Sequence, residues 1–115
     1  MNLMKLERFS RNLRGEFCGM ITIVAVLKAI QGKEEELMEI CRELAIEVRS
    51  KEEGCLMYIP HISATEKGKI VFFEKYADKE AQKIHMHSDY FRAAGVKFKE
   101  LMDGELEIQI LSELC

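Results

Sequence analysis

Two histidines lie close together in the stretch KIHMHSDYF, residues 83–91, at positions 85 and 87. A histidine can accept a proton, ligate a metal ion or satisfy buried backbone groups, because its ordinary pKa lies at about 6.5. On a strand, His85 and His87 would share a face and could bind one ion together, whereas on a helix they point about 200° apart. The chemistry open to this stretch therefore depends on the element that carries it.

The other metal-binding and nucleophilic residue types form no recognisable motif. His61 could approach His85 from a strand, but no further spacing of histidines and carboxylates is typical of a metal site, so we expect none. The four cysteines include no CxxC pair, which argues against a zinc ribbon and a thioredoxin-type redox motif. We expect the thiols to be reduced in a cytoplasm. Cys41 and Cys55 lie within apolar stretches, so we expect both to act as small hydrophobic residues.

The composition is that of one ordinary soluble domain. The chain has 115 residues, of which 48% are hydrophobic and 32% are charged, and a chain of this length can bury roughly two-thirds of its surface. Its net charge is -3, and its lysines and arginines are scattered, usually beside glutamates. Because a nucleic-acid-binding surface needs clustered cations, we expect no nucleic-acid partner.

Residues 1–19 differ in character from the rest of the chain. Cations precede the apolar run MITIVAVL as in a signal peptide, but the segment before the run is long, Lys28 follows at once and no small-residue cleavage site is present. The run is far shorter than the roughly 20 residues that cross a bilayer, so we expect a cytoplasmic protein with no membrane association. Large apolar residues recur at helical spacing within residues 1–19, so this extension is either an added helix or a loosely held segment before a natural start at Met20.

Regular periodicity begins at residue 20, and we expect the domain to cover residues 20–115. The run MITIVAVLKA, residues 20–29, is β-branched, apolar throughout and short, which predicts a strand. After a break at Gln31 and Gly32, three glutamates open a helix, where negative charge suits the helix dipole, and Gly54 marks its end. The expected buried stripe of this helix is Leu37, Ile40, Cys41, Leu44, Ala45 and Val48.

The second half of the chain predicts a hairpin, a helix and a final strand. CLMYIPHISA, residues 55–64, is a strand in which Pro60 requires an edge position or a bulge, and IVFFEKY, residues 70–76, pairs with it across the turn TEKGK. Asp78 can cap the second helix. In ELEIQIL, residues 105–111, apolar and polar residues alternate, which predicts the last strand. The order β-α-β-β-α-β predicts an α+β, ferredoxin-like fold in which both helices cover one face of a four-stranded antiparallel sheet. The expected inward face of the second helix is Ala81, Ile84, His85, Ser88, Phe91, Gly95, Phe98 and Met102.

The helical assignment separates the two histidines. His85 is expected on the apolar face with Ile84 and Ser88, whereas His87 is expected toward solvent with Lys83. A histidine at the rim of a buried helical face is more often structural than catalytic, so its position alone does not make His85 functional.

A family resemblance gives His85 more weight. The segments GCLMY, FFEKYADKEA and HMHSDYF, in this order and spacing, resemble the antibiotic biosynthesis monooxygenase family of small quinol monooxygenases over nearly all of residues 20–114. The chain departs from the family pattern at Tyr76, where many members have tryptophan, at Tyr90, where a second histidine is common, and at Gln31, where a proline is common. The residues that match the pattern are Glu74, Asp78, Glu80, Ala81, His85, Ser88 and Phe91.

The resemblance implies a monooxygenase that uses no cofactor and oxidises a small aromatic quinol or phenol with dioxygen. Such an enzyme needs a base, donors that stabilise an oxyanion and a dry aromatic enclosure. His85 would be the base or hydrogen-bond partner, and Glu74 would orient a neighbour or pair with a basic residue across a dimer. Tyr58 and Tyr76 would donate hydrogen bonds to the substrate and form part of the wall. Phe72 and Phe91 would shape the pocket.

The resemblance also implies a homodimer whose two sheets pack face to face into a barrel. The residue pattern agrees, because both alternating sets of side chains are apolar in the strands predicted at 20–29 and 70–76. The helices can cover only one of these sets, and a partner sheet is the simplest cover for the other.

Three alternative functions remain compatible with the sequence. Relatives with this fold hold haem through a histidine on the corresponding helix, so His85 could ligate haem iron, although the chain lacks the tryptophan and a first-strand asparagine. Isomerisation of a small phosphorylated signal is a second alternative function, although the sequence shows no basic cluster that could bind a phosphate group. A small-molecule-binding or stress-response barrel without catalysis is a third, because it needs the same apolar pocket.

Overall fold

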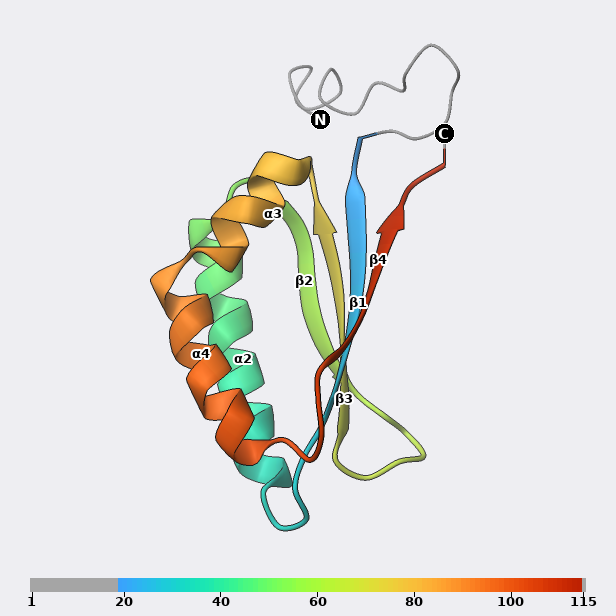
Figure 1. The fold of residues 1–115 in the computed structure, drawn as a ribbon, viewed down its shortest axis with the longest axis vertical. Coiled ribbons are helices and arrows are strands. Elements are labelled where there is room, and N and C mark those ends of the chain that lie inside the picture. The colour runs from blue at the N-terminus through green and yellow to red at the C-terminus, as the bar shows by residue number, and fades with distance from the viewer. Residues whose placement is uncertain (1–18, 115) are drawn as a thin grey trace.

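The computed structural model describes residues 19–114, which form one antiparallel sheet with three helices on one face (Figure 1). The strand order is β2-β3-β1-β4, so β1 and β3 are central and β2 and β4 are the edges. The predicted α+β ferredoxin-like fold is therefore confirmed, and the sheet of the single chain is open rather than closed. The predicted extension, residues 1–19, lies outside the described residues apart from Gly19. The elements are β1 Ile21–Lys28, α2 Glu34–Lys51, β2 Cys55–Ile62, β3 Lys69–Tyr76, α3 Lys79–Met86, α4 Asp89–Leu101 and β4 Glu107–Ser112.

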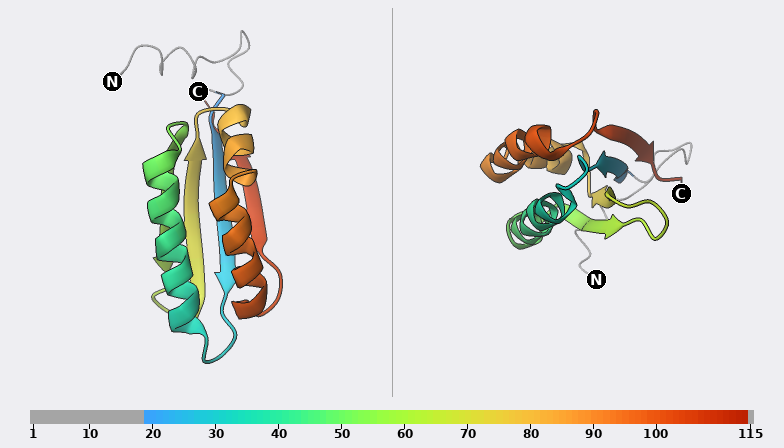
Figure 2. Two further views of the ribbon diagram at one scale, coloured as in Figure 1. Left: turned by 90° about the vertical axis from the view of Figure 1, so that its left-hand side faces the viewer. Right: turned by 90° about the horizontal axis from the view of Figure 1, so that it is seen from below.

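The two faces of the sheet differ in what covers them. On β1, every second side chain from Ile21 to Leu27 is buried, and the side chains between them are half-buried. Figure 2 shows the helices on one side of the sheet only. The strand register places Val24 opposite Phe73 of β3 and Phe73 opposite Ile59 of β2, so these three side chains share the side away from the helices. We call this side the outer face; its apolar members are Val24, Val26, Met57, Ile59, Val71, Phe73 and Leu111.

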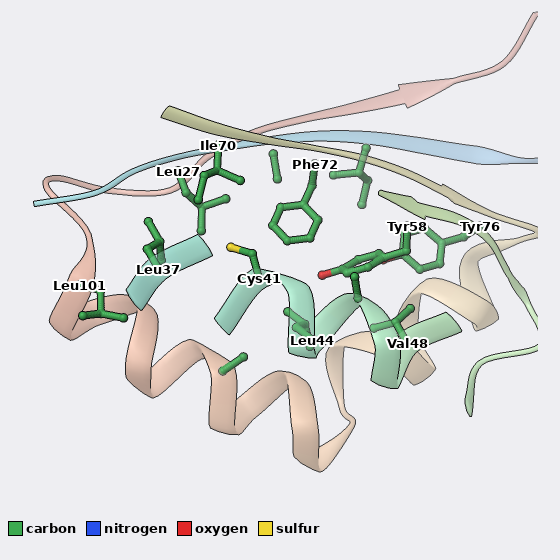
Figure 3. Packing of buried hydrophobic residues seen from close by; sticks show 14 of the residues in the cluster. Leu27, Leu37, Cys41, Leu44, Val48, Tyr58, Ile70, Phe72, Tyr76 and Leu101 are labelled. Atoms are coloured by element: carbon green, nitrogen blue, oxygen red, sulfur yellow. The ribbon is translucent and has the colours of Figure 1, made fainter. Parts of the chain in front are cut away.

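Helix α2 supplies the middle of the core. Its glutamates occupy the first turn as predicted, and both carboxylate oxygens of Glu34 accept from the backbone N–H of Gly32 at 3.0 Å. Figure 3 shows Cys41, Leu44 and Val48 of α2 close to the aromatic rings that the sheet contributes. The buried residues of α2 follow the predicted stripe, with Ile40 only half-buried: Leu37, Cys41, Leu44, Ala45 and Val48.

Strand β2 has the edge position that its proline predicts. It has a neighbour on one side only, so Pro60 can be accommodated without a second ladder bond. A separate irregularity shifts the register between Cys55 and Met57. The strand ends at Ile62, two residues before the predicted end.

The predicted second helix is two helices, which corrects the expected inward face. Helix α3 ends at Met86, and Ser88 has extended backbone dihedrals and caps α4 by accepting from the N–H of Phe91 at 3.3 Å. A serine that caps a new helix restarts the helical phase. In α4, Ala94 and Leu101 are therefore buried, which a continuous helix would not select. In α3 the buried side is that of Ala81 and His85, and Ile84 is 56% exposed instead of facing inward.

Gly54, between α2 and β2, is needed for its size, because a Cβ added there would lie 2.7 Å from the Cβ of Ala81 in α3. Gly54→Ala will therefore lower the free energy of unfolding by about 1–3 kcal/mol through overpacking. Gly95→Ala in α4 is the matched control, because a Cβ there meets nothing within 4 Å, and it will stabilise the protein by about 0.5–1 kcal/mol through helix propensity. Urea unfolding measures both, and equal effects of the two substitutions would contradict the close approach of α3 to Gly54.

Candidate active site

A cavity of about 120 Å³ lies between the helix-covered face of the sheet and the helices α3 and α4. Its wall is almost wholly apolar. Toward β4 it is bordered by side chains that are themselves exposed, Met86, Ile108 and Ile110 among them. All six site residues expected from the sequence line this cavity: Tyr58, Phe72, Glu74, Tyr76, His85 and Phe91. Figure 3 shows the rings of Tyr58, Phe72 and Tyr76 between the sheet and α2.

His85 is held at the cavity wall by a short helix and a cage of aromatic rings. Helix α3 begins where the Asp78 carboxylate accepts from the N–H of Ala81 at 2.8 Å, as its capping position predicts. His85 is 3% exposed. Three aromatic rings surround its imidazole, with centroid-to-centroid distances of 4.5–5.5 Å: those of Phe91, Tyr58 and Tyr76. These contacts leave the ring little freedom to rotate, which suits a group that must meet a reacting atom in one orientation.

The buried partner of His85 is Glu52, which the sequence analysis did not select. Nδ1 of His85 lies 3.0 Å from Oε2 of Glu52, and both side chains are at most 4% exposed. Because a carboxylate can only accept, Nδ1 carries the hydrogen and Nε2 of the neutral ring keeps its lone pair. Burial lowers the pKa of His85, and the hydrogen bond and charge of Glu52 oppose that shift. A neutral imidazole with a free nitrogen lone pair can act as a proton acceptor.

The sequence does contain a signal for the burial of Glu52. Val48 is the last buried residue of the α2 stripe, and position 52 follows it by four residues, on the same side of the helix. A carboxylate at the end of a buried stripe has to find a partner, because an unpaired buried charge is costly. Tyr90 of α4, which stands where the family often has a second histidine, also donates its hydroxyl to Oε2 of Glu52.

Glu74 is a second acid–base group in the cavity. It is 6% exposed and accepts a hydrogen bond from the hydroxyl of Tyr76 at 2.7 Å. Glu74 thus orients Tyr76, which is one of the two roles expected for it; the other was pairing with a basic residue across a dimer. Burial raises the pKa of Glu74 to about 7; the hydrogen bond from Tyr76 lowers it and the charge of Glu52 raises it further. Burial also raises the pKa of Tyr58 and Tyr76, so both hydroxyls keep their protons and can donate. The cavity therefore holds an acceptor at His85, a phenol donor at Tyr58, and the Glu74 carboxyl group, which titrates near neutral pH and is hydrogen-bonded to Tyr76.

The raised pKa of Glu74 makes stability depend on pH in a defined window. Between its ordinary value of 4.5 and about 7, the folded state keeps a proton that the unfolded state releases, so stability falls as pH rises. We expect the unfolding free energy of the parent, relative to Glu74→Gln, to fall by about 3 kcal/mol across this window. Urea unfolding at several pH values measures it, with the exposed Glu43→Gln as the control variant. A difference that does not change with pH would mean that Glu74 ionises normally.

The other two histidines and the two described cysteines, Cys41 and Cys55, do not line the cavity. His87 is exposed, and its Nδ1 contacts the carbonyl of Lys83 at 2.8 Å, so its separation from His85 is as predicted. His61 is on the outer face, edge-on to Phe73, and does not approach His85. Burial raises the pKa of Cys41 and of Cys55 to about 12, which makes both thiols poor nucleophiles.

The described part of the chain contains neither a candidate metal site nor a helix that could span a membrane. Within residues 19–114 there is no group of three or more His, Cys, Asp or Glu side chains that could hold a metal ion. None of the helices described has the length and the apolar character needed to cross a membrane.

The chain is similar to known proteins over most of its length. Residues 20–96 match the family model described as antibiotic biosynthesis monooxygenase. YcnE of Bacillus subtilis (strain 168), provisionally assigned as a monooxygenase, is 30% identical over 89 residues, which are 77% of this chain and 93% of that protein. A crystal structure from Caulobacter crescentus CB15, provisionally assigned as an antibiotic biosynthesis monooxygenase, has a TM-score of 0.81 and 38% identity, and the match covers 86% of this chain and 93% of that one. The crystal structure of a conserved protein from Methanosarcina mazei Go1 has a TM-score of 0.75 and 30% identity, and the match covers 82% of this chain and 92% of that one.

Proposed function

The chain belongs to the antibiotic biosynthesis monooxygenase family, and from this premise we propose that it oxidises a small quinol or phenol with dioxygen and uses no metal or flavin. The observation that carries the proposal is a buried imidazole, His85, whose Nδ1 is hydrogen-bonded to a carboxylate at the wall of an apolar cavity. A base that is desolvated and oriented in this way can take a hydroxyl proton from an aromatic substrate.

The reaction begins with proton transfer from the substrate hydroxyl to Nε2 of His85. The electron-rich anion then transfers one electron to dioxygen, and the two radicals combine to form a carbon–oxygen bond. The peroxide anion takes back the proton from His85, and loss of water, with the hydrogen of the same carbon, leaves a carbonyl group. One oxygen atom of dioxygen thus replaces two hydrogens of the substrate, and the other leaves as water, so that a phenol and dioxygen yield a quinone and water.

The remaining cavity residues supply the environment for this chemistry. The hydroxyl of Tyr58 donates to the developing oxyanion, where a low local dielectric strengthens the hydrogen bond, and the hydroxyl of Tyr76 holds Glu74 in place. Phe72 and Phe91 form flat walls for an aromatic ring and keep water away. Glu74, which titrates near pH 7, exchanges protons with the substrate at neutral pH.

The size and lining of the cavity favour a small apolar substrate over the alternatives. Apolar cavities of about 150 Å³ bind a benzene-sized molecule, and this cavity of about 120 Å³ is of that order. Haem, with its four pyrrole rings and two carboxylates, does not fit this space. A phosphorylated signal would find no lysine or arginine among the residues that line it. The substrate class is therefore a small quinol or phenol that enters past the exposed apolar residues near β4.

We further propose that the protein acts as a homodimer in the cytoplasm. The outer face carries Val24 and Phe73 at its centre, and Phe73 is 40% exposed. A second copy that packs its own outer face against this one would bury both apolar surfaces. The described thiols, Cys41 and Cys55, are free, which fits a reducing compartment. The cavity lies on the helix side of the sheet, so each chain would keep its own cavity.

Oxygen consumption with a panel of benzoquinols, naphthoquinols and simple phenols tests the proposed function. Turnover above the uncatalysed rate that persists in the presence of a chelator supports it, because no metal is needed. Turnover that is lost with the chelator would point to a metal instead. Binding of the same compounds, measured by calorimetry, without any oxygen consumption would replace the proposal with a small-molecule-binding protein.

A further inference from the structure

Glu52 is a buried carboxylate that connects three helices. It directly follows α2 and is 7% exposed; its Oε2 contacts Nδ1 of His85 in α3 at 3.0 Å and accepts from the hydroxyl of Tyr90 in α4. Its other oxygen, Oε1, is buried and has no hydrogen-bond partner among the described residues. A buried carboxylate with one unsatisfied oxygen is costly. Packing of the helices alone would be served as well by an apolar residue, so the cost indicates a role in the chemistry.

We propose that Glu52 is the positioning residue of the site: it holds His85 in the tautomer whose Nε2 accepts the substrate proton, and its charge stabilises the imidazolium that results. The inference rests on the proposed role of His85. In the step, the O–H bond of the substrate breaks, its electron pair stays on the substrate oxygen and an N–H bond forms at Nε2. The Nδ1–H group remains hydrogen-bonded to Oε2 of Glu52 throughout.

The charges around the ring explain why proton transfer benefits from Glu52. Before the transfer, the carboxylate faces a neutral ring; after it, the carboxylate faces a positive ring at hydrogen-bond distance, and that ion pair is strong where water is excluded. Among the described residues, His85 is the one ion-pair partner of Glu52. The other titratable groups near the ring are Tyr58 of β2 and Glu74 and Tyr76 of β3. From α4, Phe91 packs its ring against the imidazole, and Tyr90 donates its hydroxyl to the same Oε2 of Glu52.

The tautomer can be measured without any substrate. In nitrogen-15 NMR spectra of histidine-labelled protein, the His85 signals are those that His85→Ala removes. We expect a proton on Nδ1 of His85 in the parent and in Glu53→Gln, the exposed neighbour that serves as the matched control. Glu52→Gln will lose this preference. A proton on Nε2 of His85 in the parent, or no change in Glu52→Gln, would overturn the proposal whether or not the protein oxidises quinols.

Kinetics separate a positioning role from a merely structural one. Glu52→Gln will lower kcat by about 10- to 10³-fold with little change in KM, as expected when an orienting carboxylate is removed. The loss will be smaller for more acidic phenols, because they need a weaker base. The acid limb of kcat/KM will move to lower pH, since the carboxylate raises the pKa of His85.

Two further variants keep the test decisive if Glu52→Gln does not fold. Tyr90→Phe leaves the hydrogen bond to His85 intact and should lose less activity than Glu52→Gln, and Glu52→Asp should recover part of the activity. An equal loss for every substrate with an unshifted pH profile would mean that Glu52 only joins the helices. If the tautomer is as expected but no quinol or phenol is oxidised, the proposed function fails while the orientation of His85 by Glu52 stands.

Discussion

Replacing His85 with alanine will lower kcat/KM for quinol oxidation by about 10²- to 10⁴-fold, the usual contribution of a positioned proton acceptor. The imidazole is the group at the cavity wall with a free nitrogen lone pair. Of its neighbours, both tyrosines keep their protons, and Glu74 already accepts the hydrogen bond of Tyr76. His87→Ala is the matched control. It removes an exposed ring two residues away and should leave the rate unchanged.

Oxygen consumption and quinol loss should be followed together, with a parallel run from which oxygen is excluded. Thermal unfolding of both variants checks that the fold is retained. Full activity in His85→Ala, or equal losses in the two variants, would contradict the assignment of His85 as the base.

A glutamate in place of Val24 will convert the proposed dimer to a monomer. Val24 lies on the central strand β1, and its register neighbours on the outer face are Phe73 and Gln109. Each dimer would bury two unpaired carboxylates, which costs several kcal/mol and should raise the dissociation constant by at least about 10²-fold.

Light scattering after gel filtration measures the change. The parent should have close to twice the chain mass of 13.3 kDa at micromolar concentration, and Val24→Glu close to the single mass. Val96→Glu is the control, because Val96 is 62% exposed on α4, on the helix side of the molecule. A monomeric parent would contradict the dimer, and dissociation by Val96→Glu would place the interface on the helices instead.

The strands and the first helix could be predicted because their side-chain patterns have one physical cause. β1 and β3 are apolar on both alternating sets of side chains, and α2 shows a stripe of buried residues at helical spacing. The break between α3 and α4 could not be read in the same way. Ser88 fits a continuous helical face by its spacing, and only its backbone dihedrals show that it caps a new helix.

Six of the residues that line the cavity could be predicted from the sequence, but the pairing of His85 with Glu52 could not. His85 was selected by helical phase and by family spacing together, and the aromatic residues by their place in the motifs. Glu52 and His85 are 33 residues apart, and they meet only because α2 ends beside α3. A long-range pair of this kind leaves no periodic trace, although the position of Glu52 four residues after Val48 shows that its side chain faces inward.

Mass spectrometry of the product formed under isotopically labelled dioxygen tests the proposed chemistry most directly. Catalysis of the proposed kind places one labelled oxygen atom in each product molecule and the other in water, with no metal or flavin added, and His85→Ala should reduce the labelled product to the uncatalysed level. A product that carries no label, or that takes its new oxygen atom from water, would contradict the monooxygenase reaction proposed for this cavity.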